Sequence, residues 1–363
     1  MSVTKDGDTG RWMSQIRVTD WTGKTIHKKK RGFSTKKEAL QWERDFISQS
    51  TGSLGMTFGD FIALYVKDME HRLKPSTVAS KKWLIDLKVT PFFKKIPLNE
   101  IKPTHVRQWQ NSLTSYRDEN GKPYSQTYLK CINNQLSAIF NHAVRYYELR
   151  SNPAAKVGNM GSEEHREMLF WTKEEYKKFA FEMMDKPVSF YAFEMLYWCG
   201  IREGELLALT SADFDFDKET VTINKSYQRL HGEDVITTPK TKKSNRTIKM
   251  PHFLCEEMQE YLGMLYGLKK KDRIFTVTKS YLHHEMDRGA KAAGVKRIRI
   301  HDLRHSHISL LIDMGFSAVA IADRVGHESI EITYQYAHLF PSKQTEMAER
   351  LDDLGKGDFE NVS

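Results

Sequence analysis

The sequence of 363 residues contains few cysteines and no long apolar run, and each shortage argues against a class of protein. Cys131, Cys199 and Cys255 lie far apart and are odd in number, which argues against a disulfide framework and against a thiolate metal site. We expect buried, reduced thiols in a reducing cytoplasm. No apolar stretch approaches the roughly 20 residues that span a bilayer, and the start, MSVTKDGDTGRW, lacks a signal-peptide core. We therefore expect neither export nor a membrane partner.

The composition is that of a folded chain. Hydrophobic residues make up 39% and charged residues 28% of the sequence, which argues against disorder. The sequence shows no internal repeat and no low-complexity tract. A length of 363 residues favours two or three domains.

Positive charge is concentrated in the front half. The net charge is +9, yet residues 1–50 hold 11 Lys and Arg against 6 Asp and Glu, and residues 51–160 hold 16 against 8. Residues 161–363 are net negative, with 29 against 33. A basic front half indicates a polyanionic partner, most often nucleic acid.

Residues 1–50 have the pattern of a small sheet with one packed helix, and we expect three strands. The stretches 11–18 and 24–33 are strand-like, with a turn at 20–23, and 34–49 is helical with a Ser or Thr cap. The second strand contains a basic run, Lys28, Lys29, Lys30 and Arg31. Such a run is either a solvated strand edge or a sheet surface that contacts phosphates in a DNA groove.

After a linker at 50–56, residues 56–152 are expected to form four or five helices. Pro75 and Pro103 stand where helix starts tolerate a missing N–H, and a long helix is predicted over 125–149. Lysines and arginines occupy the faces left by the apolar stripes, and Lys81 and Lys82 are the expected DNA contacts among them. A turn at Asn152-Pro153 ends the block, and 153–168 is expected to be a second linker.

The remaining region has a mixed pattern. Helices are predicted over 171–184, where Thr172 and Glu175 form a capping box, and over 189–199, which ends at Gly200. Strands are predicted over 219–229 and 234–250, which are rich in Thr, Val and Ile, and helices resume after Pro251.

Five short segments of this region combine residues that carry chemistry. They are CGIREGELLAL with Arg202, TPKTKKSNRTIKM with Lys240, Lys242 and Lys243, HDLRHSH with His301 and Arg304, the pair Gly326-His327, and TYQYAH with Tyr334 and Tyr336. Each alone has a structural explanation, because arginines pair with nearby glutamates, lysines in turns are solvated, histidines cap helices and tyrosines pack. Chance rarely produces the ordered combination.

In this order the segments resemble the tyrosine recombinases, the phage-integrase family. The family pattern is an Arg in G-(L/I)-R-x-x-E-L, a Lys in a β-turn, H-x-L-R, G-H, and a Tyr nine residues after that His with x-His behind it. The sequence has Gly200-Ile201-Arg202 with Glu205-Leu206, Lys240, His301-Asp302-Leu303-Arg304, Gly326-His327 and Tyr336-Ala337-His338. Tyr334 falls two residues short of the spacing and is expected to pack or position. The front half, less specifically, looks like the arm-binding and core-binding domains of integrases from phages and conjugative elements.

The resemblance implies a multidomain α+β fold. Its expected parts are an arm-type DNA-binding domain at 1–50 with a small three-stranded sheet plus helix, an all-α SAM-like core-site domain at 56–152, and a mixed, mainly helical α+β catalytic domain with a C-terminal tail at 165–363. It also implies an enzyme, a site-specific DNA recombinase that integrates and excises a mobile element through a covalent 3′-phosphotyrosine. The implied catalytic residues are Arg202, Lys240, His301, Arg304, His327 and the nucleophile Tyr336, with Lys242 and Lys243 as further DNA contacts.

The residue types suit this reaction. Attack on a phosphodiester builds up negative charge, which arginines stabilise because their planar forks bind phosphate bidentately. Histidines manage protons, a lysine beside arginines can act as general acid, and a tyrosine forms the covalent ester. The ester conserves the bond energy, so no cofactor or ATP is expected. No metal is expected either, because there is no acidic triad at a plausible spacing.

The resemblance further implies the partners. They are double-stranded DNA with core-type and arm-type sites and three more copies of the chain, since the family works as a tetramer on synapsed DNA. The helical segment 342–354 is expected either to pack on a neighbouring copy or to cover its own domain. An excisionase or a host DNA-bending protein is admitted as a further partner, and the expected location is the bacterial cytoplasm, in association with the nucleoid.

Several alternatives stay open on the sequence. The general acid is Lys240 or Lys242, because the turn varies in length, and Glu205 either orients Arg202 or serves the fold. The alternatives in function are a cellular resolvase or invertase, a non-catalytic DNA-binding regulator on this fold, and a type IB topoisomerase. Residues 1–50 and the complete motif set favour the integrase.

Overall fold

The computed structural model describes residues 3–7, 9–19, 25–51, 56–164, 168–230, 232–239, 241–334, 336, 348 and 351–352. They belong to two compact units, residues 1–166 and 167–363. The expected turn at 20–23, most of the linker at 50–56 and most of the C-terminal segment 342–354 lie outside the described residues.

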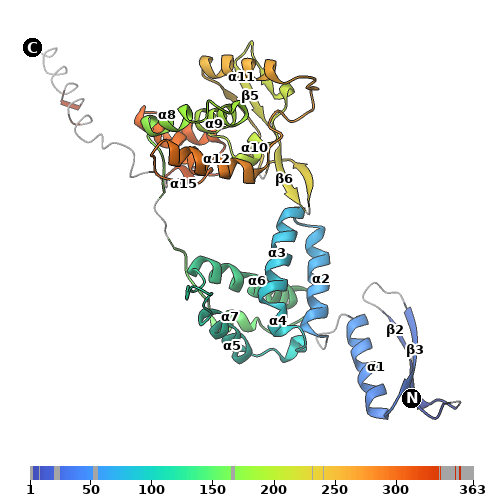
Figure 1. Ribbon diagram of the computed structural model, residues 1–363. Helices are drawn as coiled ribbons and strands as arrows, with labels where there is room; N and C mark the ends of the chain where they lie inside the picture. The colour runs from blue at the N-terminus through green and yellow to red at the C-terminus, as the bar shows by residue number, and fades with distance from the viewer. Residues whose placement is uncertain are drawn as a thin grey trace, which may run out of the picture. The chain divides into compact units, whose positions relative to one another are not determined.

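The first unit begins with a three-stranded antiparallel sheet and one helix, as expected (Figure 1). The strands are β1 (Val3–Lys5), β2 (Trp12–Thr19) and β3 (Thr25–Phe33), in that order, and α1 (Lys36–Thr51) packs on one face. Ser14 and Ile16 of β2 are buried, and Phe33 lies beside Trp42 of α1 with ring centroids 5.8 Å apart. This face is therefore the small core of the sheet.

The register divides the basic run of β3 between the two faces, because strand side chains alternate. Lys28 and Lys30 stand opposite Ile16 and Ser14, on the side where α1 packs. The Nζ atom of Lys30 lies 5.5 Å from the ring centre of Trp42 on α1, a cation–π distance. These two lysines therefore flank the helix.

Lys29 and Arg31 stand on the other face. Their partners across the strand pair are Gln15 and Met13, and both cations are exposed. Arg31 lies 3.6 Å from Asp6, which is an ion-pair distance. This helix-free face is the one that a DNA groove could receive.

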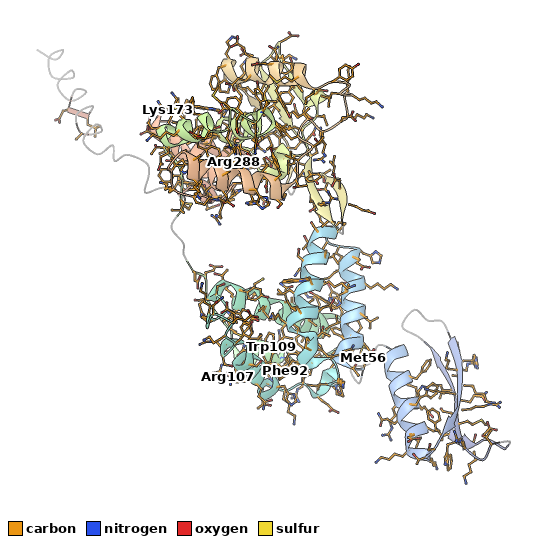
Figure 2. The ribbon with its side chains drawn as sticks, in the orientation of Figure 1. Met56, Phe92, Arg107, Trp109, Lys173 and Arg288 are labelled. Carbon is orange, nitrogen blue, oxygen red and sulfur yellow. The ribbon has the colours of Figure 1, made fainter. Side chains whose placement is uncertain are left out.

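The helical block of the first unit contains the helices that the proline and cap signals predicted. They are α2 (Phe58–Glu70), α3 (Pro75–Lys88), α4 (Thr90–Phe93), the 3-10 turn η1 (Leu98–Glu100), α5 (Pro103–Thr114), α6 (Gln126–Tyr146) and α7 (Pro153–Val157). Thr57 and Ser125 cap α2 and α6 with their side chains. Trp109, labelled in Figure 2, is buried in this block and donates its indole N–H to the carbonyl of Lys88 at 2.8 Å, which ties α5 to the end of α3.

The linker predicted over 153–168 is wrong over its first part. Asn152 caps a helical turn, α7, and Ala154 and Met160 are buried in the core of the helical block. Gly161 has φ +78°, and a Cβ there would meet the carbonyl of Gln126 at 2.2 Å. The Asn-Pro signal is a helix start rather than a domain end, because Pro is also favoured at the first helical position.

Lys81 and Lys82 both lie on α3, and their surroundings differ. The Nζ atom of Lys81 donates to Oε1 of Gln135 at 2.8 Å, and the side chain is partly buried, whereas Lys82 is exposed. Of the two predicted DNA contacts, Lys82 is the more accessible.

The second unit is mixed and mainly helical, so the predicted α+β class is confirmed. Its helices are α8 (Lys173–Phe181), α9 (Pro187–Cys199), α10 (Glu203–Leu206), α11 (His252–Met264), α12 (Lys279–Ala292), α13 (Asp302–Asp313), α14 (Ala318–Val325) and α15 (Glu331–Tyr334). The strands β4 (Phe214–Asp215), β5 (Thr220–Ile223) and β8 (Arg246–Lys249) form one sheet, and β6 (Ser226–Leu230) and β7 (Glu233–Thr237) form a hairpin. Two 3-10 turns, η2 (Ser211–Asp213) and η3 (Lys242–Ser244), precede β4 and β8.

The expectations for the three cysteines have different outcomes. All three cysteines are free thiols, but only Cys199 and Cys255 are buried, and the expectation for Cys131 is wrong because it lies exposed on α6. Across the part of the chain that the structure describes, no helix is both long and apolar enough to cross a membrane.

An acidic pair lies between α9 and α11 in the core of the second unit. Glu194 is buried and accepts a hydrogen bond from the hydroxyl of Tyr176 at 2.7 Å. Glu257 has a buried Oε2 without a hydrogen-bond partner. Burial, with repulsion from Glu194 and Glu260, raises the pKa of Glu257 to about 7. The charged form is therefore disfavoured in the folded state.

We expect the substitution Glu257→Gln to stabilise the protein at alkaline pH. The pKa of Glu257 is raised on folding, so its contribution to stability is complete below about 4.5 and is lost as the pH rises through about 7. Glutamine removes that loss, which amounts to about 1–2 kcal/mol for a partly exposed group. Thermal melts at about pH 5 and pH 8 measure it. The control is Glu256→Gln, on the exposed side of α11, and equal pH dependence of Tm in wild type and Glu257→Gln would contradict the expectation.

Candidate active site

Three arginines meet the C-terminal end of α14. The carbonyl of Val325 accepts from Nη2 of Arg304, the carbonyl of Arg324 accepts from Nε of Arg246 at 3.0 Å, and the carbonyl of Gly326 lies 3.5 Å from Nη2 of Arg202. The last carbonyls of a helix have no partner within the helix and carry partial negative charge. Three consecutive carbonyls therefore collect three cations at one point.

Gly326 allows another segment of the chain to approach this end of α14. It adopts the left-handed conformation, with φ +70°, and closes the helix. A Cβ at Gly326 would meet the carbonyl of Lys243 at 2.8 Å and Cδ of Arg246 at 2.9 Å. The glycine of the Gly-His motif thus lets the lysine-rich turn 241–245 approach the helix end.

Arg304 is buried between the ends of two helices. It is 2% exposed, and its Nη1 donates to the carbonyl of Gly200 at 2.8 Å, just beyond α9. Gly200 also has positive φ, at +60°, and a Cβ there would meet the ring of His307 at 2.5 Å. Burial and the charges of Arg202 and Arg246 lower the pKa of Arg304 to about 9, so it remains protonated at neutral pH.

Glu205 holds Arg202 in place, which answers the question that the sequence left open. Its carboxylate accepts from the backbone N–H of Arg202 at 3.0 Å and from Nη1 of the same residue at 2.7 Å. It also pairs with Nη2 of Arg246 at 3.0 Å. Burial alone would raise the pKa of Glu205, but Arg246 and Arg202 outweigh this effect, and the pKa is lowered. The side chain of Arg202 stays 37% exposed, so it can reach a ligand from solvent.

The two predicted histidines lie in this positive field. The ring of His327 is fixed by a contact of 2.8 Å between Nδ1 and Oγ1 of Thr333, which leaves Nε2 for a substrate. Burial and the charges of Arg304 and Arg202 lower the pKa of His327 to about 3. His301, at the start of α13, has an exposed edge, yet desolvation, His305 and the arginines lower its pKa to about 4. Both rings are neutral at neutral pH.

The two tyrosines are not equivalent. Tyr336 is 3% exposed and packs with Ile308, Ile321 and Val325, whereas Tyr334 is 54% exposed. Burial raises the pKa of Tyr336 to about 12, although the charge of Arg304 acts in the opposite direction. Its hydroxyl is therefore protonated at neutral pH. Of the two expectations for Tyr334, the packing role is wrong, because the side chain is 54% exposed. The positioning role stays a prediction.

Other predicted residues are only partly described. Lys240 and His338 lie outside the described residues, so the structure does not choose between Lys240 and Lys242. The backbone of Lys242 begins η3, and Lys243 is exposed beside the end of α14.

Sequence reasoning missed two residues of the site. Arg246 is nearly buried and bridges Glu205 and the end of α14, and His305 hydrogen-bonds with the hydroxyl of Tyr336 through Nδ1. A signal existed for each. Arg246 is a charged residue within the strand predicted over 234–250, and His305 directly follows the arginine of the H-x-L-R motif.

The arrangement suits a phosphate group. Arg202 and Arg246 share the one buried glutamate, Glu205, and Arg304 adds a third positive charge, so the cluster carries excess positive charge. The partly exposed guanidinium of Arg202 is of the type that binds phosphate bidentately. Within the described ranges, no group of three or more His, Cys, Asp or Glu could hold a metal ion. A neutral histidine pair and a protonated tyrosine lie beside the cluster.

Family models match three stretches in chain order. An arm DNA-binding domain matches residues 2–50, an N-terminal SAM-like domain of phage integrases matches 57–114, and the phage integrase family matches 169–343. Among relatives, the ICEBs1 integrase of Bacillus subtilis (strain 168) is 31% identical over 344 residues, which cover 88% of this chain and 91% of the relative. The integrase of Mycobacterium phage L5 is 24% identical over 74% of this chain and 72% of its own.

Solved structures show the same fold at lower identity. The Tn1549 transposon integrase in complex with transposon right end DNA has a TM-score of 0.63 at 20% identity, covering 82% of this chain and 99% of that one. A lambda integrase tetramer bound to a Holliday junction has a TM-score of 0.58 at 18% identity, covering 94% and 95%. With three family models in order and a relative 31% identical over most of both chains, this chain belongs to the phage integrase family of tyrosine recombinases.

Proposed function

We propose that the protein is an integrase that cuts and rejoins DNA at specific sites, through a 3′-phosphotyrosine on Tyr336, to integrate and excise a mobile element. The observation that carries this is the position of the buried Tyr336 hydroxyl in the field of Arg304, within one cluster that also holds Arg202 and His327. The relatives are integrases by name, and two similar structures hold DNA.

The arginines stabilise the charge that develops on the phosphate. Arg202 binds the non-bridging oxygens from the open side of the site, held at the correct angle by Glu205. Arg304 uses two N–H groups on helix carbonyls and keeps three for the phosphate. His301 and His327, neutral in the free protein, add hydrogen bonds. This fixed set of donors stabilises the transition state without reorganisation.

The covalent step exchanges one phosphoester for another. The bond from Tyr336 Oη to phosphorus forms as the bond from phosphorus to the 5′ oxygen breaks. The phenolic proton passes to a base in the site, and Lys240 protonates the leaving oxygen. Rejoining runs the step backwards with the 5′ hydroxyl of another strand. No external energy source is needed, because the phosphotyrosine retains the ester bond.

The DNA contacts and partners follow from the domains. Residues 1–50 bind arm-type sites, the helical block from residue 56 binds core sites with Lys82 exposed on α3, and residues 165–363 perform the reaction. A tetramer assembles on two synapsed duplexes, as the lambda integrase structure shows for that protein. Lys242 and Lys243 contact the DNA near the cleaved strand, and an excisionase or a host DNA-bending protein sets direction in the bacterial nucleoid.

Tyr336→Phe is expected to abolish covalent protein–DNA adducts while leaving DNA affinity unchanged, because only the nucleophilic oxygen is removed. Nicked core-site duplexes that trap the adduct, followed on denaturing gels, measure it. Tyr334→Phe is the matched control and is expected to form adducts at the wild-type rate, since that side chain is exposed. Adducts with Tyr336→Phe and none with Tyr334→Phe would reverse the assignment, and binding without adducts in wild type would favour a non-catalytic regulator.

Lys240→Ala is expected to slow cleavage by about 10²- to 10⁴-fold, the usual contribution of a general acid. A substrate with sulfur in the 5′ bridging position should restore the rate, because a thiolate leaves without a proton. Lys242→Ala in the same turn is the control and should need no rescue. If sulfur rescues Lys242→Ala instead, then Lys242 is the general acid.

The double variant Lys29→Ala/Arg31→Ala is expected to weaken binding to arm-type DNA by about tenfold or more, because two phosphate contacts are lost from the free face of the sheet. Lys28→Ala/Lys30→Ala makes the same change in charge on the helix side of the sheet, and its affinity for arm-type DNA is expected to fall much less. Fluorescence anisotropy on duplexes that tile the ends of the host element measures the DNA affinity of both double variants. A variant without residues 1–50 gives the largest loss of arm-site affinity that can be expected. Equal losses in the two double variants would show that only net charge matters.

A further inference from the structure

A histidine to which the proposed function gives no role lies against the Tyr336 hydroxyl. His305, on α13, hydrogen-bonds through Nδ1 with Tyr336 Oη, and the two ring centroids are 5.6 Å apart. Behind the imidazole, Nε2 lies 3.7 Å from Oδ1 of Asp302, three residues earlier on the same helix. Carboxylate, imidazole and hydroxyl stand in the order in which a carboxylate orients a base toward a nucleophile.

Asp302 is itself held in position. It is buried and accepts the backbone N–H of Arg299 at 2.8 Å, together with Nε and Nη2 of the same residue. At 3.7 Å from Nε2 of His305, its carboxylate is beyond hydrogen-bond length but acts electrostatically. It favours the tautomer with the proton on Nε2, which leaves Nδ1 to accept from the tyrosine.

Burial, together with nearby arginines, keeps the ring of His305 neutral, so that it can accept a proton. Burial lowers its pKa, the carboxylate of Asp302 acts in the opposite direction, and Arg299 and Arg304 lower it further. Among the described residues, the neutral rings of His301 and His327 are further neighbours of His305. Tyr336, with a pKa of about 12, is almost entirely protonated at neutral pH and needs a base in order to attack.

We propose that His305, oriented by Asp302, is the general base that receives the Tyr336 proton during strand cleavage; this rests on the proposed function of Tyr336 as nucleophile. The bond from Tyr336 Oη to phosphorus forms, the bond from phosphorus to the 5′ oxygen breaks, and the phenolic proton passes to Nδ1 of His305. The general acid protonates the 5′ oxygen. In rejoining, the 5′ hydroxyl returns its proton to the general acid and His305 returns its proton to the tyrosine oxygen.

The test is His305→Asn, which keeps a polar atom near the position of Nδ1 but takes up no proton at neutral pH. Single-turnover adduct formation on a nicked core-site duplex is measured from about pH 6 to pH 9, with the amount of bound DNA held equal. We expect a loss of about 10²- to 10⁴-fold at neutral pH. The rate of the variant should keep rising with pH where the wild-type rate has levelled, because ionised tyrosine then replaces the base. His284→Asn, an exposed histidine of α12, is the matched control and should behave as wild type.

A fluorinated tyrosine at position 336 separates a base from a structural role. Its phenol is more acidic, so it should restore much of the activity of His305→Asn and change the wild-type rate little. A wild-type rate in His305→Asn, or a loss that is independent of pH and not rescued by the fluorinated tyrosine, would overturn the proposal.

Asp302→Asn gives an independent measurement. Loss of the carboxylate lowers the pKa of His305, so the acid limb of the pH–rate profile should shift to lower pH while the plateau rate falls. An unshifted limb would remove Asp302 from the proposal. Failure of the underlying function gives a different result, because wild type would then form no adduct or Tyr336→Phe would still form one.

Discussion

The carbonyls at the C-terminal end of α14 are the feature on which the whole site depends. Three consecutive residues, Arg324, Val325 and Gly326, present carbonyl groups that lie within hydrogen-bond reach of three arginines from three other segments of the chain. A helix end supplies partial negative charge without an ionisable group. It therefore gathers guanidinium groups without neutralising them, and their full charge remains for a phosphate.

The positive field has consequences for every titratable neighbour. Burial and this field together lower the pKa values of His301 and His327, so these rings are neutral donors and acceptors rather than competing cations. Glu205 is an anion whose pKa the arginines lower against the effect of burial, and it orients Arg202 and Arg246. Tyr336 is different, because burial outweighs the arginines and keeps its hydroxyl protonated. The arginine cluster can therefore bind a phosphate, but the protonated Tyr336 cannot attack it without a base. His305, which hydrogen-bonds with the Tyr336 hydroxyl, lies where that base is needed.

In the N-terminal sheet, too, the position of each charge matters as well as the number of charges. Four consecutive cations on β3 look like one patch, but the register sends two toward the side of α1 and two to the free face. Lys29 and Arg31 share the free face with Gln15 and Met13 of β2, and β3 is at the same time an edge strand of the sheet. Charge alone attracts DNA along its length, whereas a surface with fixed spacing can favour particular sites.

Local signals were sufficient for most of the secondary structure and for the motif set. The capping box at Thr172, the proline starts at Pro75 and Pro103, and the spacing of nine residues from His327 to Tyr336 are readable because they act within a few residues. The same locality produced the error at Asn152-Pro153, where a helix start and a domain end share one signal. The short strand β1 had no pattern of its own, because three residues are too few to show alternation.

By itself, the sequence determined which residue types are present, in which order, and hence the family of reactions. Only the tertiary structure decided which carbonyls receive which arginines, that Glu205 aims Arg202, that Arg246 belongs to the site, and that His305 and Asp302 stand behind Tyr336. The pairs Glu205 with Arg202 and Asp302 with His305 are each three residues apart. The contacts of Arg246 with the end of α14 and of His305 with Tyr336 instead join segments far apart in the chain, which no local pattern can show. Hydrogen bonds to backbone carbonyls depend on where a helix ends in space and leave no trace in side-chain identity.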